Sequence, residues 1–505
     1  MTKAYLVGVD LGTGSCKALV ANPDCVPLGF SSASYPAPDT QARWIEQDPE
    51  SLLAGLVEAV QAALREADVS RGDCCLGLSV GGALHSIMAL DSQDVPLTGV
   101  MTWADTRATP WATQLSQTSV AKTLYERTGC PAHAMYPLAK IIWLREERPD
   151  IFNRARWLVS AKEYVTLRLT GHRVVDYSIA GGTGLLNTHE AEWDRKALDV
   201  AGIQPRQLFT LGRPEQNLGR VRSEFAETMG LPPSTPIILG SSDAVNSSLG
   251  AGAVGSKQYT CMVGTSGALR LISRKPILDP EGRSWCYAID PEHWLVGGAI
   301  NNGGLALQWL RDTLRGVQNT VSFEDLIKWA SEVEPGAGGL LCLPLLAGER
   351  SPYWDSTVRG TLLGLSLSHD HRHCARAFIE GVCFAMRNLR EILDEIGGAC
   401  DEVRASGGFA RSCLWLQTMA DVLDRPLLVP SLEETSSVGA WFWALRGAGR
   451  FDGLGRAARF VEANELYQPR REFVDRYAEL YRIYTRVYPA LLDTFTALAE
   501  YRRAL

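Results

Sequence analysis

Two short turns, each rich in glycine and threonine, are the first candidates for chemistry in this sequence. Gly12 and Thr13 separate two apolar stretches near the N-terminus, and Gly264 and Thr265 begin a similar turn near the middle of the chain. Such a turn lets backbone N–H groups converge on phosphate oxygens, and the threonine hydroxyl adds another donor. One turn alone is usually an ordinary hairpin. Two of the same design predict a phosphate clamp to which both halves of the chain contribute.

Two aspartates stand where they could act with these turns. Asp10 ends the first apolar stretch, and a carboxylate there could hold Mg²⁺ against ATP phosphates. Asp243 follows the apolar run 236–239 and precedes an expected helix, whose dipole would keep the carboxylate ionised. An ionised carboxylate can accept the proton of a substrate hydroxyl as a phosphoryl group is transferred to it. From the pattern alone, a helix cap is an equally good interpretation of either aspartate.

Polar and aromatic residues between the expected strands could contact a sugar. His85 lies between two apolar stretches and could bind hydroxyl groups, although a single histidine is more often structural. Trp103, Asp105 and Arg107 combine an aromatic face with two charges, which suits a polyol or a surface ion pair equally well.

Two other phosphate-binding motifs can be excluded. The sequence contains no G-x-x-x-x-G-K-[ST], so a P-loop fold is not expected. Residues 250–255 match G-x-G-x-x-G, but no clear strand precedes them and no acidic residue follows at a suitable distance. A dinucleotide-binding fold is therefore not predicted either.

The elements that position these residues alternate between strand and helix. Strand, turn and strand occur near residue 12 and again near residue 265, and Asp48 and Pro49 begin an amphipathic helix. This alternation predicts an α/β fold with two domains of like topology, at residues 1–245 and 246–505. The apolar stripe of the segment 473–505 predicts a helix packed on the core.

Composition limits the class of protein. The 505 residues are 46% apolar and 21% charged, and the net charge is −7, which argues against a nucleic-acid surface. No apolar run is long enough to span a membrane, and the chain enters a strand almost at once, without a signal peptide. The 12 cysteines contain no CxxC pair, so we expect reduced thiols and a cytoplasmic protein.

Together these residues resemble the FGGY family of carbohydrate kinases, and the resemblance covers essentially the whole chain. Residues 135–147 fit the first signature of that family, and residues 360–380 fit the second except at Cys374 and Phe378. Several stretches are similar to gluconate kinases in particular, namely 84–86, 102–107, 282–283, 286–288, 301–304, 347–352 and 407–412. D-xylulose kinases share the architecture, the catalytic aspartate and a histidine at the position of His85.

The resemblance implies two actin-like (ribonuclease H-like) domains with the active site in the cleft between them. It implies that Asp10 is associated with Mg²⁺, that Asp243 is the catalytic base, and that the turns at Gly12-Thr13 and Gly264-Thr265 bind the phosphates of ATP. The implied adenosine-side residues are Gly304, Gln308, Gly407, Gly408 and Ser412, the last of which is asparagine in some relatives. The implied sugar-side residues are Leu84, His85, Trp103, Asp105 and Asp243.

The resulting hypothesis is an ATP-dependent kinase that acts on a terminal hydroxyl of a small sugar or sugar acid, with gluconate preferred and D-xylulose as the alternative. The carboxylate of gluconate needs a cation in the sugar pocket, for which Lys140, Lys162 and Arg107 are the candidates. An actin-like or chaperone-like ATPase that binds a protein partner is the alternative from another class. A sugar sensor without turnover is another, which the presence of both aspartates disfavours. Dimers are common among relatives, so a homodimer is possible.

Overall fold

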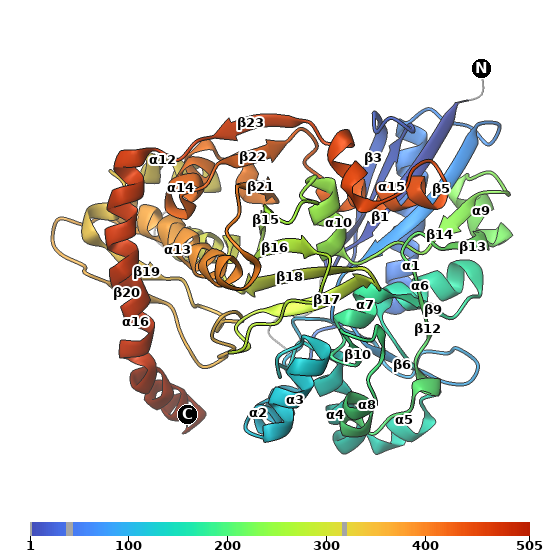
Figure 1. Ribbon diagram of the computed structural model, residues 1–505, viewed down its shortest axis with the longest axis horizontal. Coiled ribbons are helices and arrows are strands. Elements are labelled where there is room, and N and C mark those ends of the chain that lie inside the picture. Colours follow the sequence, from blue (N-terminus) through green and yellow to red (C-terminus); the bar gives the residue numbers. More distant parts are fainter. Residues whose placement is uncertain (1–2, 37–43, 316–320, 505) are drawn as a thin grey trace.

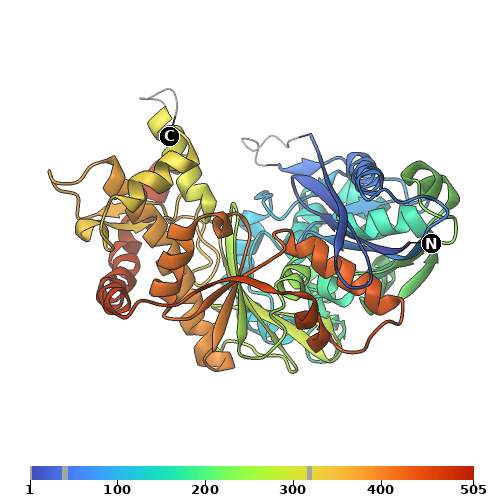
Figure 2. The same cartoon turned by 90° about the horizontal axis from the view of Figure 1, so that it is seen from above.

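The computed structural model describes residues 3–36, 44–315 and 321–504, which form two α/β lobes joined side by side (Figure 1). The view from above shows the lobes at opposite ends of an elongated molecule, with the last long helix at the outer end of one lobe (Figure 2). All 12 cysteines are free thiols, as the sequence predicts. Within the described part of the chain, every helix is too short or too polar to cross a membrane.

The N-terminal lobe is organised around a six-stranded sheet. Its strand order is β3-β2-β1-β5-β14-β13, and β1, β5 and β14 run parallel to one another. The outer strands β2, β3 and β13 are antiparallel to their neighbours. The strands are β1 (Ala4–Leu11), β2 (Ser15–Ala21), β3 (Pro27–Ser34), β5 (Cys74–Gly82), β13 (Asn217–Arg220) and β14 (Pro236–Ile238).

The C-terminal lobe repeats this sheet. Its strand order is β17-β18-β16-β15-β21-β22-β23, and again the three central strands β15, β21 and β22 are parallel. The neighbours β16, β18 and β23 are antiparallel, as β2, β3 and β13 are in the first sheet. The strands are β15 (Gln258–Val263), β16 (Gly267–Ser273), β17 (Trp285–Asp290), β18 (His293–Ile300), β21 (Glu402–Ser406), β22 (Leu427–Pro430) and β23 (Ala463–Tyr467).

The two sheets thus share the same succession of parallel and antiparallel strands over six positions, and the same chain order over the first five, which confirms the predicted duplication. Each sequence-predicted Gly/Thr turn joins equivalent strands, β1 to β2 in one lobe and β15 to β16 in the other. The remaining short strands are β4 (Glu46–Gln47), β6 (Met88–Leu90), β7 (Val100–Met101), β8 (Trp157–Val159), β9 (Val174–Asp176), β10 (Leu186–Asn187), β11 (Glu192–Trp193), β12 (Thr210–Gly212), β19 (Leu341–Leu343) and β20 (Thr361–Leu363).

Helices cover the sheets and fill the space between the lobes. Those of the N-terminal half are α1 (Pro49–Glu66), α2 (Thr109–Ser116), α3 (Ser119–Thr128), α4 (Pro137–Glu147), α5 (Pro149–Arg154), α6 (Ala161–Thr170), α7 (Tyr177–Gly181), α8 (Arg195–Ala201) and α9 (Ser223–Met229). The others are α10 (Asp243–Gly250), α11 (Gly304–Arg315), α12 (Phe323–Ser331), α13 (His371–Gly397), α14 (Cys413–Leu423), α15 (Thr435–Gly447) and α16 (Arg471–Ala504).

Local sequence explains the ends of these helices. Asp48 caps α1 by accepting hydrogen bonds from Glu50 N and Ser51 N, and Pro49 takes the first helical position, as predicted. The aromatic stripe of α16 lies against the core, where Tyr477 and Tyr484 are buried. The last predicted residue of that segment, 505, lies outside the described residues.

One helix of the second half of the sequence packs on the first sheet. In Figure 1, α15 lies beside β1 and β5 of the opposite lobe. Gly8 of β1 makes this possible, because a Cβ atom there would lie 2.2 Å from Ser437 O and 2.3 Å from Trp441 N. The chain therefore returns across the lobe boundary before it completes the second sheet.

The crossing of α10 and α15 also depends on glycine. A Cβ atom on Gly250 would lie 1.8 Å from Thr435 O, and one on Gly439 would lie 2.1 Å from Asn246 O. Each helix thus presents a glycine to the backbone of the other. Because α10 begins at Asp243, this close approach also fixes the element that carries the proposed base.

We expect Gly439→Ala to destabilise the fold. The added methyl group meets backbone atoms that cannot move aside, and overpacking of this kind costs about 1–3 kcal/mol or more. The midpoint of urea unfolding measures this loss. Gly455→Ala is the matched control, because no atom lies within 4 Å of its added Cβ. Equal midpoints for the two variants would contradict the proposed helix contact.

Candidate active site

The proposed sugar and metal residues of the first lobe gather at one edge of its sheet. Asp10 lies at the end of β1, Leu84 follows β5, and Asp243 follows β14. These three strands are parallel neighbours, so their carboxyl ends meet at the same edge. A backbone bridge between Gly82 and Ser242 brings the last two segments into contact.

Asp10 has an environment suited to a carboxylate that binds a cation. Its Oδ1 atom is shielded from solvent and has no hydrogen-bond partner among residues 3–36, 44–315 and 321–504. Burial and the nearby carboxylate of Asp243 raise the pKa of Asp10 to about 7, and the charge of Lys17 opposes this shift. A carboxylate oxygen is a ligand that Mg²⁺ prefers, so the unpaired atom fits the metal that the sequence predicts. The structure also places Asp10 and Asp243 within electrostatic reach of each other.

Asp243 occupies the first turn of α10 without serving as its cap. Ser242 is the N-cap residue, and its hydroxyl accepts a hydrogen bond from Val245 N. Asp243 Oδ1 accepts one from Ala244 N at 2.7 Å. Desolvation raises the pKa of Asp243, while the charge of Arg270 and backbone N–H groups, including that of Leu84, lower it. These backbone hydrogen bonds fix the orientation of the Asp243 carboxylate. Both aspartates lie at the same edge of the first sheet.

The first glycine turn shares a small cavity with two sugar-side residues. Gly12 and Thr13 line it together with Leu84 and Trp103. Trp103 Nε1 donates a hydrogen bond to Thr13 Oγ1 at 3.1 Å, and Gln47 Nε2 donates one to Thr13 O at 2.5 Å. The structure thus joins the predicted phosphate turn directly to the predicted sugar side.

The second glycine turn opens onto a cavity of about 910 Å³ in the C-terminal lobe. Gly264 and Thr265 stand at one end of it, and apolar side chains such as Leu307 and Ile327 form part of its wall. The predicted nucleotide residues that line this cavity are Gly264, Thr265, Gly304, Gln308, Gly408 and Ser412. Residues far apart in the sequence are therefore brought to one space of a size suited to a nucleoside.

Three of the predicted nucleotide residues support the cavity rather than offer a free side chain to a ligand. Gly304 N donates a hydrogen bond to Gly264 O at 2.7 Å, which ties α11 to the turn. Ser412 caps α14, where its hydroxyl accepts a hydrogen bond from Trp415 N. Gly407 does not line the cavity but lies next to the turn, with a φ of +90°. A Cβ atom at this position would clash with Val263 O, at 2.7 Å.

His85 is buried among aromatic rings at the junction of the lobes. Its Nδ1–H donates to Gly182 O at 2.7 Å, which leaves Nε2 as the acceptor of the neutral ring. Burial lowers the pKa of His85 to about 3, so the ring is neutral at physiological pH. The rings of Tyr136, from the first half, and Tyr287, from the second, stand at centroid distances of 5.0 and 5.7 Å. The two tyrosine hydroxyls share a hydrogen bond of 2.7 Å across the lobes.

Asp105 and Arg107 are bound to each other and to the protein. Arg107 donates to both carboxylate oxygens of Asp105, at 2.9 and 2.7 Å, and pairs with Glu46 at 2.7 Å. Asp105 Oδ2 also accepts a hydrogen bond from Ile45 N, and the side chain is 0% exposed. Asp105 lies beside a cavity of about 120 Å³ between the lobes, but its carboxylate faces inward, as a residue that fixes the loop.

The two lysines suggested as partners of a substrate carboxylate are also engaged. Lys140 Nζ donates to three backbone carbonyls, those of His85, Thr102 and Met135, at 2.6 to 2.9 Å. Lys162 forms a buried ion pair with Asp176. Neither lysine, like Arg107, is therefore available to a ligand.

Two arginines that the sequence interpretation did not consider as ligands stand at this junction. Arg270 lies on β16, and Arg350 follows β19 with its guanidinium 5.3 Å from the ring centroid of Trp103. The signal for Arg270 was present in the sequence, since a charged residue interrupts the apolar run 268–272. Arg350 lies within the stretch 347–352, which is similar to gluconate kinases, but the residues next to it in the sequence do not predict that it is buried.

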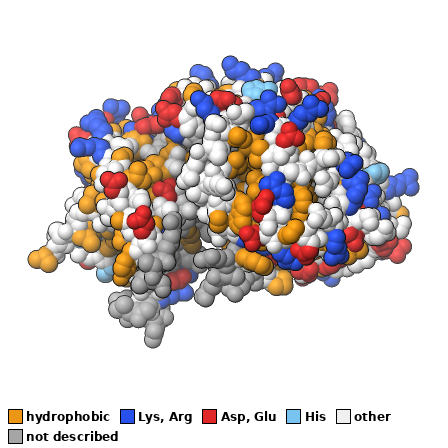
Figure 3. Space-filling view, turned by 90° about the horizontal axis from the view of Figure 1, so that it is seen from below, with side chains coloured by type: hydrophobic (Ala, Val, Ile, Leu, Met, Phe, Trp, Pro, Cys, Tyr) orange, Lys and Arg blue, Asp and Glu red, His pale blue; other side chains and the backbone are white. Residues whose placement is uncertain are grey.

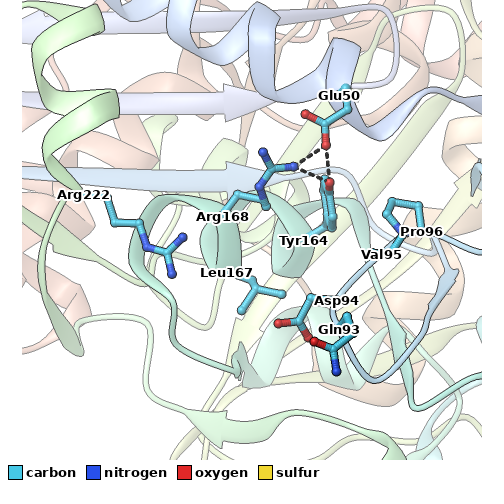
Figure 4. A pocket seen from close by; sticks show the side chains of 9 residues that line it. All are labelled: Glu50, Gln93, Asp94, Val95, Pro96, Tyr164, Leu167, Arg168 and Arg222. Carbon is cyan, nitrogen blue, oxygen red and sulfur yellow. Dashed lines mark hydrogen bonds and ion pairs between the residues drawn. The ribbon is translucent and has the colours of Figure 1, made fainter.

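A further pocket, on the outer side of the N-terminal lobe, contains none of the predicted site residues. Its volume is about 360 Å³, and Glu50, Tyr164 and Arg168 form a hydrogen-bonded group in its wall (Figure 4). On the face shown in Figure 3, basic and acidic side chains of the described residues are interspersed without a continuous basic stripe.

Comparison with known proteins gives consistent results. The family models for the N-terminal and C-terminal domains of FGGY carbohydrate kinases match residues 5–250 and 259–448. The gluconokinase of Bacillus subtilis is 34% identical over 99% of both chains. Crystal structures of a gluconate kinase and a xylulose kinase from Lactobacillus acidophilus superpose with TM-scores of 0.93 and 0.92, each at 30% identity. They cover 98% of this chain and 99% and 100% of their own.

Proposed function

Because this chain belongs to the FGGY family of carbohydrate kinases, we propose that it transfers the γ-phosphoryl group of ATP to a terminal hydroxyl of gluconate. Its enzyme class is that of a phosphotransferase acting on a sugar alcohol group, and its two domains have the predicted ribonuclease H-like fold. This class replaces the alternative of an ATPase that serves a protein partner. The substrate and the roles of individual residues are our proposals.

The observation that carries the proposal is the placement of Asp10 and Asp243. Both carboxylates stand at the carboxyl ends of the central parallel strands, within electrostatic reach of each other. Phosphoryl transfer needs one group to accept the proton of the attacking hydroxyl and counter-charges to hold the phosphates. A cap role for Asp243 does not explain the arrangement, since Ser242 already caps the helix.

In the proposed reaction, Asp243 accepts the proton of the substrate hydroxyl as its oxygen attacks the γ-phosphorus. A pKa raised by desolvation makes the carboxylate a better base than an exposed aspartate. The backbone N–H groups of the two glycine turns donate to the phosphates from opposite lobes. Asp10 is the residue that would hold Mg²⁺, which neutralises charge on the phosphates when bound.

The proposed substrate pocket lies at the lobe junction. His85 Nε2 accepts a hydrogen bond from a sugar hydroxyl, and Trp103 offers its ring to the carbon chain. Asp105 acts on the sugar indirectly, by fixing the loop that carries Trp103. We place the adenosine moiety in the cavity of the C-terminal lobe beside Gly304, Gln308, Gly408 and Ser412, with Gly407 supporting the turn from behind.

We further propose residues 1–245 and 246–505 as the two domains. The last strand of the first sheet ends at Ile238 and the first strand of the second begins at Gln258, which supports a boundary between them. Under this division, α15 is a helix of the second domain that packs on the sheet of the first.

D-xylulose is the second candidate substrate. Its support is the xylulose kinase from Lactobacillus acidophilus, which is as similar in identity as the gluconate kinase structure. Xylulose carries no charge, so it would leave no role for a cation in the sugar pocket.

A coupled assay of ADP formation tests the proposal. The purified protein with ATP and Mg²⁺ is given gluconate, D-xylulose, ribulose, glycerol or erythritol, and kcat/KM is measured for each. We expect gluconate to give the highest value. A higher kcat/KM for xylulose would overturn the substrate assignment but leave the kinase class intact.

A further inference from the structure

Five arginines are buried in the described part of the chain, and they differ in whether the guanidinium forms an ion pair. Arg107, Arg376 and Arg390 each form an ion pair with a carboxylate. Arg270 and Arg350, which are 6% and 8% exposed, form none with any described residue. Buried charges are normally paired, because removing an ion from water is costly. The two exceptions therefore need an explanation.

The hydrogen bonds of the two guanidinium groups are also incomplete. Arg270 Nη1 donates to Ser247 Oγ, and Arg350 Nη2 donates to Ile300 O, both at 2.9 Å. In each side chain the buried Nε–H has no acceptor among the described residues. A guanidinium is a fork of donors suited to a planar anion, so each one retains unused capacity.

Nearby carboxylates do not supply the missing partner. Glu349 directs Oε1 to the backbone N–H of Arg350 at 2.9 Å, and forms no ion pair with the guanidinium. The charge of Asp243 stabilises that of Arg270, but the two side chains form no ion pair in the part of the chain that the structure describes. Glu349 Oε1 is thus engaged by backbone N–H groups, and its Oε2 is buried without a hydrogen-bond partner among the described residues, so it does not reach the guanidinium of Arg350. Asp243 is reserved for its proposed role as base.

Both arginines lie near residues of the proposed sugar pocket. The guanidinium of Arg350 stands over Trp103, and Trp103 is bonded to the first phosphate turn. Burial raises the pKa of Tyr287, which contacts His85, and the charges of both guanidinium groups oppose this shift, so both groups lie near its hydroxyl. Burial lowers the pKa of Arg270 to about 10. The charge of Asp243 opposes this shift and that of Arg350 adds to it, so the two cations lie near each other.

We propose that Arg270 and Arg350 form a cation pair that binds the carboxylate of a sugar-acid substrate. Both guanidinium groups donate hydrogen bonds to the carboxylate, and the carbon chain extends from there so that its opposite end reaches Asp243. The pair makes the pocket selective for aldonates over neutral ketoses of similar length, because a neutral ligand leaves two buried charges without a counter-ion. This inference rests on the proposed kinase function and identifies the residues that select the substrate.

The test compares Arg350→Met and Arg270→Met with the wild type. Removing one partner of a buried charge pair costs enough to raise the gluconate KM of Arg350→Met by about 30-fold or more. We expect the affinity for MgADP to stay unchanged. The gluconate KM of Arg350→Lys should lie between those of the wild type and Arg350→Met, because lysine keeps the charge but loses the forked set of donors. Arg387→Met is the matched control, since Arg387 is a largely buried arginine of α13 that pairs with Glu391 away from the pocket. Its gluconate KM should equal that of the wild type.

Thermal shifts provide a readout that does not need turnover. Gluconate alone should raise the Tm of the wild type and of Arg387→Met, but not of Arg350→Met. A neutral six-carbon polyol, glucitol, should shift all of them equally little. The ligand-free Tm of Arg350→Met should not fall, because the lost guanidinium had no ion pair.

The possible failures are distinguishable. If the wild type turns over gluconate and both methionine variants keep its KM, the carboxylate site is wrong and the kinase function stands. If both variants lose kcat while KM is unchanged, the guanidinium groups act on the phosphates, which also overturns the carboxylate assignment. A wild type that accepts only neutral sugars overturns both the gluconate proposal and this inference.

Discussion

Asp243→Asn is expected to lower kcat for gluconate phosphorylation by about 10²–10⁴-fold, the usual contribution of a general base. The carboxamide has nearly the same shape as the carboxylate and can still accept a hydrogen bond from Ala244 N, so the pocket should keep its form. It cannot accept the proton of the attacking hydroxyl. The KM for ATP and the affinity for ADP should therefore remain close to those of the wild type, and steady-state kinetics with calorimetry measures both.

Asp370→Asn provides the matched control for that experiment. Asp370 also lies at a helix N-terminus, where it caps α13 by accepting hydrogen bonds from Arg372 N and His373 N. Asparagine is as good a cap as aspartate, so this variant should keep both activity and stability. If Asp243→Asn behaves like Asp370→Asn, the carboxylate of Asp243 is structural and the proposed base is wrong.

Asp10→Asn is expected to lower kcat by about 10²–10³-fold, because a group that counters phosphate charge in the reacting complex is lost. Stability should move in the opposite direction. The Oδ1 atom of Asp10 is buried and has no hydrogen-bond partner among the described residues, and the carboxylate of Asp243 repels it. Removing the charge should therefore stabilise the ligand-free protein. The Tm without ligands at pH 8 should stay level or rise.

The dependence of Tm on Mg²⁺ and ADP completes this test. In the wild type, Mg²⁺ should add to the shift that ADP produces, and in Asp10→Asn this addition should be lost. Asp48→Asn, at the exposed cap of α1, is the control and should respond as the wild type does. A full response to Mg²⁺ in Asp10→Asn would contradict the role of Asp10.

The framework of the fold could be predicted because its signals are local. Apolar strands around the turns at Gly12 and Gly264 indicated two equivalent hairpins, and both exist. Asp48 and Pro49 marked a helix start that the structure reproduces. The position of Asp243 after a strand and before a helix likewise required only neighbouring residues. Such features depend on backbone preference and short-range capping, which one sequence is enough to reveal.

Which charged side chains pair within the protein, and which remain available to a ligand, could not be predicted in this way. Arg107 and Lys140 looked like candidates for a substrate carboxylate, yet the first pairs with Asp105 and the second with three carbonyls. Arg270 and Arg350 form no ion pair with any residue that the structure describes, because strands and loops from distant parts of the chain surround them. Whether a cation is satisfied or free is set by long-range packing, for which spacing along the sequence carries no signal. The resemblance placed the pocket, but not the partners within it.

The central claim is that the protein phosphorylates a sugar acid rather than hydrolysing ATP. Phosphorus NMR of the protein with ATP, Mg²⁺ and gluconate tests it most directly. We predict a phosphomonoester resonance that grows in step with ADP, without inorganic phosphate, and that is absent when gluconate is omitted. Inorganic phosphate released at the same rate with or without gluconate, and no ester, would contradict the account.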